Sequence, residues 1–452
     1  MISKYQSWIV VFVLAVAVVG RGNAKELESL CAEVQISISQ EASLERQAFE
    51  ASMVIKNSLD TLALEDVEVQ LLYTDSAGNP VEVTNDPAPG SAYFFERLDE
   101  TVDVDAIDGT GTIAPATSAE IRWLIIPTAG AAGVTVGGEL YFIGANLSYT
   151  FGGEPQTINV VPDTIVVKPQ PLLTLDYFLT QEVIADDAFT PEVEPPVPYT
   201  LGVRVKNNGF GTANNIHLES AQPKIIENDQ GLAIGFKIVG SFINDQLATK
   251  RLGVSFGNIE SNQSSVARFV MESTLSGEFT EFSASVTHAD TLGGELTSLI
   301  QAANTSLLVR DVRVDLPGRD SVNDFLAINA DGLRIYESEP ANTSMAGCLD
   351  CAVVTPLEGS MDNSGSTEGV ITRVVTATST PGYVHIQWAD PFDGEKKMTR
   401  VVRSDGKVLL AENYWRSQTR ADDNINFDRF INVFDTDGGA SYTLTFDSGA
   451  AG

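Results

Sequence analysis

Apolar and polar residues alternate along many short stretches of this chain, a pattern typical of β-strands with one buried face. Clear examples are "AEIRWLIIP" (119–127), "LYFIGANLSYTF" (140–151), "YTLGVRVKNN" (199–208) and "FTEFSASVTH" (279–288). Turn sequences such as "KNNGFG" and "DSAGNP" separate the stretches. Helical spacing is confined to two short segments, 296–305 and 321–328. The pattern predicts an all-β fold of antiparallel β-sandwiches.

One block of this pattern occurs twice. "GTIAPATSAEIRW" (111–123) and "GNIESNQSSVARF" (257–269) share the frame G-x-I-x4-S-x4-aromatic with identical spacing. Upstream of each lies a strand that ends in Lys-Asn, followed by a second strand. Farther along, "GGELYFIGANLSYTFGGE" (137–154) is matched by "SGEFTEFSASVTHADTLGGE" (276–295). The repetition predicts two tandem copies of one sandwich domain.

The expected domain boundaries follow from the repeat. The first copy covers 25–168 and the second 169–311, and Pro169 and Pro171 interrupt the extended segment between them. Residues 312–452 do not repeat the frame, although they contain strands such as "YVHIQWADP" and a hairpin signal in "RSDGK". We expect a third β-rich, sandwich-like domain there.

The N-terminus has the features of a secretory signal peptide. Residues 1–24 carry one Lys, an apolar run from Trp8 to Gly20, and small residues at Gly22 and Ala24. We expect cleavage after Ala24, no later membrane span, and a soluble protein that is secreted or displayed at the cell surface.

The charge balance limits the partners. The chain carries 28 basic and 61 acidic residues, a formal net charge of −33. Such a surface repels nucleic acid and anionic lipid and tolerates divalent cations. The expected partner is a protein or a glycan at the cell surface, and the oligomeric state is left open.

Three cysteines cannot all pair within one exported chain. Cys348 and Cys351 form "CLDC" in a loop punctuated by Gly and Ser, without the helix that a thioredoxin-type motif requires. We expect a structural disulfide between these two residues. Cys31 stands alone, and its pairing is left open.

Calcium is the most plausible ion for so acidic a chain, because it prefers several oxygen ligands from Asp, Asn and carbonyl groups. "FDTDGGAS" offers Asp435 and Asp437, and "DVDAIDGTG" offers three further aspartates, but neither completes an EF-hand loop. Asp435 and Asp437 are the weak calcium candidates, and acidic turn residues are the alternative. No other cofactor is expected.

The sequence contains no recognisable catalytic constellation. Its three histidines, His217, His288 and His385, all fall within strand-like segments, and neither HExxH nor GxSxG occurs. A carboxylate pair of the glycosidase type is invisible to a sequence search, because the two groups need only be close in space. We expect no enzyme activity.

"LGVRVKNNGFGTANNIHLES" and "GNIESNQSSVARFVM" resemble the immunoglobulin-like modules of exported bacterial surface proteins, in particular the CARDB-type and conserved-repeat adhesion domains. The resemblance covers about 25–311 and implies a role in adhesion or scaffolding without catalytic residues.

Two functions are compatible with these features. The first is a non-catalytic secreted or cell-surface protein acting in adhesion, scaffolding or envelope or matrix assembly through tandem immunoglobulin-like domains. The second is a carbohydrate- or calcium-binding accessory module of an exported enzyme system. The second would need exposed aromatic residues on one sheet face, and the candidates are Tyr93, Phe94 and Phe95 in "AYFFERL" and Tyr414 and Trp415 in "ENYWRS".

Overall fold

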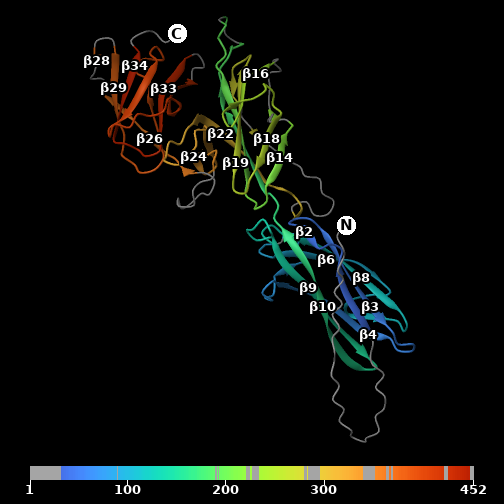
Figure 1. Cartoon of the computed structure of the whole chain (residues 1–452). Coiled ribbons are helices and arrows are strands. Elements are labelled where there is room, and N and C mark those ends of the chain that lie inside the picture. Colours follow the sequence, from blue (N-terminus) through green and yellow to red (C-terminus); the bar gives the residue numbers. More distant parts are fainter. Residues whose placement is uncertain are drawn as a thin grey trace, which may run out of the picture.

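The structure, a computed structural model, describes residues 32–88, 90–188, 191, 193–219, 224–225, 234–278, 282–283, 296–339, 352–362, 366–367, 370–421 and 426–447. These residues are arranged as three β-sandwiches in chain order, the third beside the second (Figure 1). The predicted all-β class is confirmed. No helix in the described part of the chain is long and apolar enough to cross a membrane. The expected signal peptide, Cys31 and the predicted Cys348–Cys351 disulfide lie outside the described residues.

The first sandwich packs two sheets over one apolar core. One sheet has the order β1 (Ala32–Ile38), β3 (Phe49–Asn57), β8 (Ser118–Pro127), β6 (Phe94–Val102) and β5 (Val83–Thr84). The other has the order β2 (Ala42–Leu44), β10 (Glu154–Lys168), β9 (Glu139–Phe151), β4 (Leu64–Asp75) and β7 (Asp108–Ile113). Buried residues alternate with exposed ones along β3, so only one face of this strand enters the core.

The second sandwich repeats this arrangement in part. Its main sheet runs β17 (Gln246–Leu247), β16 (Phe236–Ile243), β19 (Ser264–Ser273), β13 (Tyr199–Asn207), β11 (Leu173–Thr180) and β22 (Ile300–Val312). The other strands form three short pairs: β12 (Glu182–Val183) with β20 (Gly277–Glu278), β14 (Ala213–Leu218) with β18 (Val254–Ile259), and β15 (Lys224–Ile225) with β21 (Phe282–Ser283). Residues of β12, β14 and β18 pack against the inner face of the main sheet. β11 pairs antiparallel with β13 and parallel with β22.

The repeated G-x-I frame occupies equivalent places in both sandwiches. Lys56 lies opposite Ser118 in the first, and Lys206 lies opposite Ser264 in the second. The β4–β7 and β14–β18 pairs share a bulge, whose residues Asp66 and Asn215 both have positive φ. The frame therefore records a duplication down to strand register.

The other quoted match has no such equivalence in strand pairing. Glu139 begins β9, which pairs with β4 and β10, whereas Gly277–Glu278 form β20, which pairs with β12. Residues 279–281 and 284–295 lie outside the described residues.

A buried asparagine ends the equivalent strands β3 and β13. The Asn57 amide donates to the carbonyls of Leu62, Ile113 and Ala114. The Asn207 amide donates to those of Gly211 and Ile259. Asn57 is 1% exposed and Asn207 is fully buried. Each side chain satisfies carbonyls that the sandwich core removes from water, which explains the Lys-Asn ending in both copies.

The main sheet of the second sandwich does not end at the predicted boundary between residues 311 and 312. That boundary falls inside β22, and β23 (Asp324–Asn329), β24 (Gly332–Tyr336) and β25 (Ala352–Val353) extend the same sheet to nine strands. We call β23 and β24 the bridging hairpin. The sheet curls over itself, so that β23 lies on the face of β13. A Cβ at Gly202 on β13 would lie 2.5 Å from a ring carbon of Phe325 on β23.

The bridging hairpin is buried on both faces. Phe325 and Tyr336 pack on the outer face of β11 and β19 with Phe178, whose ring centroid is 4.5 Å from that of Phe325. Leu326 and Ile335 face the third sandwich. Both segments predicted with helical spacing are wrong: 321–328 leads into β23 and 296–305 leads into β22. A strand covered on two sides has consecutive apolar residues and loses the alternation that identifies it.

The third sandwich packs two sheets over its own core. One has the order β26 (Thr355–Glu358), β30 (Val384–Ala389), β33 (Phe427–Asp435) and β32 (Tyr414–Arg420). The other has the order β27 (Ser360–Asp362), β29 (Val370–Thr376), β34 (Ser441–Asp447) and β31 (Met398–Arg403), with β28 (Ser366–Thr367) also paired to β29. A 3-10 turn, η2 (Ala411–Asn413), precedes β32.

The linker between the first two sandwiches packs on a glycine turn. A Cβ at Gly209 would lie 2.4 Å from the Gln170 carbonyl oxygen, and one at Gly211 would lie 2.6 Å from that of Pro169. Only glycine allows so close an approach of two backbones. Arg46 of the first sandwich also donates a hydrogen bond to the Pro171 carbonyl.

The equivalent asparagines should be equally important for stability. We expect Asn57→Ala and Asn207→Ala each to lower the free energy of unfolding by about 2 kcal/mol, because buried carbonyls lose their donors. Denaturant unfolding measures the loss, and hydrogen exchange identifies the sandwich affected. Asn159→Ala, at an exposed position on β10, is the control, with an expected change within about 0.5 kcal/mol. Equal losses for all three variants would contradict this assignment.

Candidate functional site

A buried ion pair within the second sandwich contacts the bridging hairpin. Arg204 on β13 is 2% exposed and donates through two nitrogens to Asp176 Oδ2, at 2.7 and 2.9 Å. It also donates to the Glu337 carbonyl at 3.1 Å, and its guanidinium lies 5.1 Å from the ring centroid of Tyr336. Asn304 donates to the second Asp176 oxygen. Both charges are paired and hydrogen-bonded, as buried charges require, so the hairpin is fixed in place.

Asp324 clamps the base of the hairpin. Its Oδ2 accepts the backbone N–H of Val314 at 2.8 Å, and its Oδ1 accepts that of Ser338 at 2.7 Å. Burial raises the pKa of this carboxyl to about 7 and outweighs the two N–H donors, which favour the charged form.

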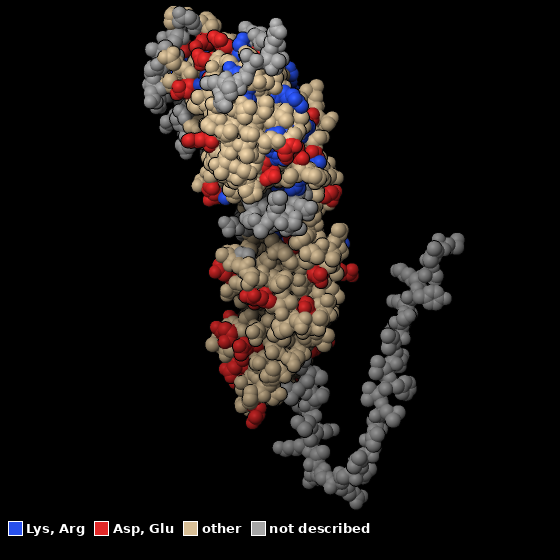
Figure 2. Space-filling model, turned by 90° about the vertical axis from the view of Figure 1, so that its left-hand side faces the viewer, with Lys and Arg blue, Asp and Glu red and all other residues tan. Residues whose placement is uncertain are grey.

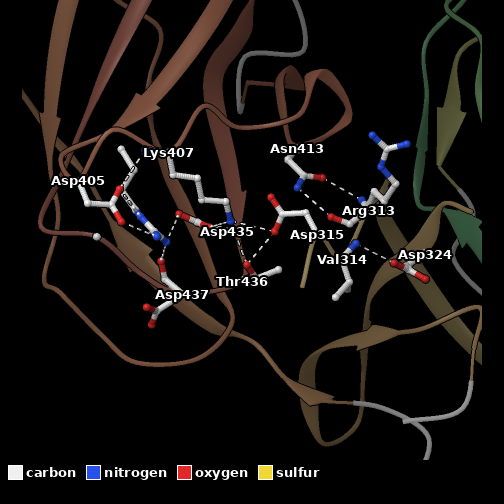
Figure 3. Close-up of polar contacts among 12 residues, drawn as sticks. Arg313, Val314, Asp315, Asp324, Asp405, Lys407, Asn413, Asp435, Thr436 and Asp437 are labelled. Atoms are coloured by element: carbon white, nitrogen blue, oxygen red, sulfur yellow. Dashed lines mark hydrogen bonds and ion pairs between the residues drawn. The ribbon is translucent and has the colours of Figure 1, made fainter. Parts of the chain in front are cut away.

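The third sandwich is held to the end of β22 by a polar cluster, drawn in Figure 3. The Asn413 side chain donates to the Arg313 carbonyl and accepts from the Arg313 N–H, both at 2.8 Å. Beside it, Lys407 Nζ donates to Asp315 at 2.8 Å and to Asp435 at 2.9 Å. We call Asp315, Arg403, Lys407, Asp435 and Thr436 the junction cluster.

The predicted calcium residues fall in this cluster, but cations of the protein already surround Asp435. Its carboxylate is fully buried and accepts from Lys407, from Arg403 at 3.2 Å and from Tyr442 at 3.0 Å. Asp437 contributes its backbone carbonyl to Arg403. Among the described residues, no group of three or more His, Cys, Asp or Glu side chains is placed to hold a metal ion. The sequence pattern identified Asp435 and Asp437, but it did not indicate that Arg403 and Lys407 contact Asp435.

The other predicted candidates are dispersed. His217 is exposed in the second sandwich, whereas His385 is half-buried in the third, where its imidazole contacts Asn432 and desolvation lowers its pKa. His288 lies outside the described residues. In "DVDAIDGTG", Asp105 and Asp108 accept the N–H groups of Thr112 and Thr110 and stabilise their own turn.

The aromatic candidates are mostly core residues. Phe94 is fully buried, Phe95 is 6% exposed and Trp415 is 7% exposed, while Tyr93 is 45% exposed. Tyr414 is half-buried and donates to the Thr399 carbonyl. These residues do not form the row of exposed rings that a sugar-binding face would need.

A cleft of about 590 Å³ lies between the second and third sandwiches. This volume is within the range of about 300–1,000 Å³ that ligand sites occupy. Its walls come from the ends of β11 and β22, the start of β13, the loop 390–395 and the edge strand β32. None of the sequence motifs indicated it, because its walls lie far apart along the chain and meet only through the curled sheet.

Most charged groups on the cleft walls are paired. Arg429 contacts Asp393 and Arg268 contacts Asp311, both at 2.6 Å. Arg310 is exposed and forms no ion pair in the described part of the chain; its guanidinium lies 6.0 Å from the ring centroid of Trp415. The cleft therefore offers a cation that is available to a ligand.

Basic residues are unevenly spread over the surface. On the face in Figure 2, the lower half, formed by the first sandwich, shows many acidic side chains and almost no basic ones. Basic side chains gather in the upper half. On this face, basic side chains are thus concentrated in the half of the molecule formed by the second and third sandwiches.

Comparisons with known proteins give no family. No protein-family model matches, and no curated protein is similar. Among solved structures, the secreted serine protease VesC from Vibrio cholerae is 6% identical with a TM-score of 0.18; the match covers 56% of this chain and 52% of VesC. The type II cohesin dyad from the ScaA scaffoldin of Acetivibrio cellulolyticus is 10% identical with a TM-score of 0.14; the match covers 60% of this chain and 97% of the dyad. The Escherichia coli adhesin FdeC is 12% identical with a TM-score of 0.15; the match covers 93% of this chain and 89% of FdeC. We draw nothing about function from likenesses this small.

The junction cluster predicts that Asp435 stabilises the fold without calcium. We expect Asp435→Asn to lower the free energy of unfolding by about 2 kcal/mol or more, because Lys407 and Arg403 lose their buried counter-charge. The loss should be equal in millimolar calcium and in EDTA, as measured by denaturant unfolding. The control is Asp437→Asn at an exposed side chain, for which we expect a change within about 0.5 kcal/mol. A calcium-dependent loss in both variants would restore the metal site.

Asp324 predicts a pH dependence. Because the folded chain favours its protonated form up to about pH 7, folding takes up a proton between the ordinary Asp pKa of about 3.9 and that value. The free energy of unfolding should fall as pH rises through this window, by up to about 1.4 kcal/mol per pH unit, and level off above it. Asp324→Asn should flatten the profile, whereas Asp331→Asn, at an exposed position in the turn of the bridging hairpin, should retain it. Parallel profiles for wild type and Asp324→Asn would refute the assignment.

Proposed function

We propose that the protein is a non-catalytic secreted or cell-surface protein that acts in adhesion, scaffolding or envelope assembly. Its tandem sandwiches, of the immunoglobulin-like kind that CARDB-type modules exemplify, act as a rigid support that presents faces and loops to a partner protein or glycan. Sandwich domains typically use their surfaces in this way.

The observation that carries this proposal is duplication of the framework with divergence of the surface. Strand register, bulge and buried asparagine are equivalent in both copies. The outer face of β3 remains half exposed, whereas that of β13 is covered by the bridging hairpin. Two domains that share a strand framework but differ in their surfaces are expected in a protein whose role is to position binding surfaces.

The aromatic candidates give little support for a glycan-binding face. Phe94, Phe95 and Trp415 are buried in hydrophobic clusters. Glycan recognition by a flat stack of rings therefore has little support among these candidates, and the accessory-module alternative is not favoured.

The proposal is tested by surface accessibility on intact cells. An epitope inserted in the exposed turn at Gly78 should be labelled by antibody without lysis, whereas a cytoplasmic marker should not. Deleting the gene should reduce attachment of the cells to their substratum or weaken the envelope. Labelling only after lysis would refute the proposed location. Normal attachment and envelope integrity after deletion would refute the proposed role.

A further inference from the structure

The cleft is bordered by a free strand edge. β32 is the last strand of the sheet β26-β30-β33-β32 and pairs on one side only, with β33. Main-chain groups of successive residues in a strand point alternately to its two sides. One side of β32 therefore carries donors and acceptors that the sheet does not use.

Two hydrogen bonds establish which residues point outward. The Ala421 N–H donates to the Asn426 carbonyl, on the β33 side. The Arg420 N–H donates to Glu182 Oε1 of the second sandwich at 2.9 Å, on the opposite side. By alternation, the N–H and C=O groups of Gln418 and Arg416 also point away from β33. Within the described residues no hydrogen bond to these main-chain groups is found, and both residues line the cleft.

The opposite wall has the chemistry to receive alternate side chains of a strand. Val197, just before β13, and Val309 on β22 supply apolar surface. Arg310, the cation without a carboxylate partner in the described residues, lies on the same wall. An added strand would direct one set of side chains toward this surface, where an acidic group could pair with Arg310.

We propose that an extended peptide segment of a partner protein binds in this cleft as an added fifth strand of the β32 sheet, with an acidic side chain contacting Arg310. This assignment rests on the proposed role as a surface protein and specifies the chemistry of its partner. Main-chain hydrogen bonds to Arg416 and Gln418 provide affinity, and the apolar wall and Arg310 provide specificity. A second copy of the chain is disfavoured as the occupant, because two chains of formal net charge −33 repel each other.

The test uses a display library of random eight-residue peptides selected on the full chain. We expect enriched peptides to alternate β-branched or aromatic residues with polar ones and to include Asp or Glu. Affinities of the synthetic peptides are then measured by calorimetry. N-methylation of alternate peptide nitrogens on the pairing edge should abolish binding, whereas N-methylation on the other edge should be tolerated.

Two variants examine the two halves of the proposal. Gln418→Pro removes one outward N–H, and proline is tolerated where that group faces away from the sheet; we expect about fivefold weaker binding. Arg310→Ala should weaken acidic peptides about tenfold and leave their Asn or Gln counterparts unchanged. Arg400→Ala, at an exposed position on β31, is the matched control and should bind like the wild type.

The outcomes are distinct. Failure to enrich any peptide, binders insensitive to both variants, or concentration-dependent self-association that Arg310→Ala abolishes would each overturn the proposal. Surface labelling of intact cells is independent of these results, so a failed peptide selection alongside a labelled surface would refute the cleft assignment alone.

Discussion

The architecture depends on one constraint: the main sheet of the second sandwich carries large apolar side chains on both faces, and both faces are covered. Its inner face packs against the short strand pairs, and its outer face carries Phe178 and the Arg204–Asp176 ion pair. The chain meets the constraint by curling the same sheet over itself through the bridging hairpin. Because the back of that hairpin is also apolar, the third sandwich must pack on it. The cleft lies where the third sandwich, packed on the hairpin, faces the second sandwich.

The sequence predicted the repeating part of the fold because local physics determines it. Alternation identified the strands, and the shared frame indicated a duplication, which the equivalent pairings of Lys56 with Ser118 and Lys206 with Ser264 match. It did not predict the continuation of the sheet past residue 311. Phe325, Leu326 and Ala327 are consecutive buried residues, and such a run is ambiguous between a helix and a strand buried on both faces.

Far less of the candidate site could be predicted. Asp435 and Asp437 were identified as acids near a Gly-rich turn, which suggested calcium. The groups that decide the chemistry, Arg403 and Lys407, come from another hairpin and approach only after folding. The cleft depends on contacts more remote still, since Arg310 and Trp415 belong to different sandwiches. Ion-pair partners and cavities between sandwiches arise from tertiary contacts. The hydrophobic periodicity along the chain therefore cannot predict them.

The parallel pairing of β11 with β22 has a mechanical consequence. The chain enters the main sheet at Leu173, at the start of β11, and the adjacent strand β22 ends at Val312, so these two points lie at opposite ends of the strand pair. Beyond Val312 the chain continues through the bridging hairpin of the same sheet. Tension applied between Leu173 and Val312 would pull the two strands past each other lengthwise. The paired positions from Leu173 to Thr180 would then be stretched in shear and have to break together, since none could peel away first. The parallel β11–β22 pair is thus arranged to resist lengthwise tension between Leu173 and Val312.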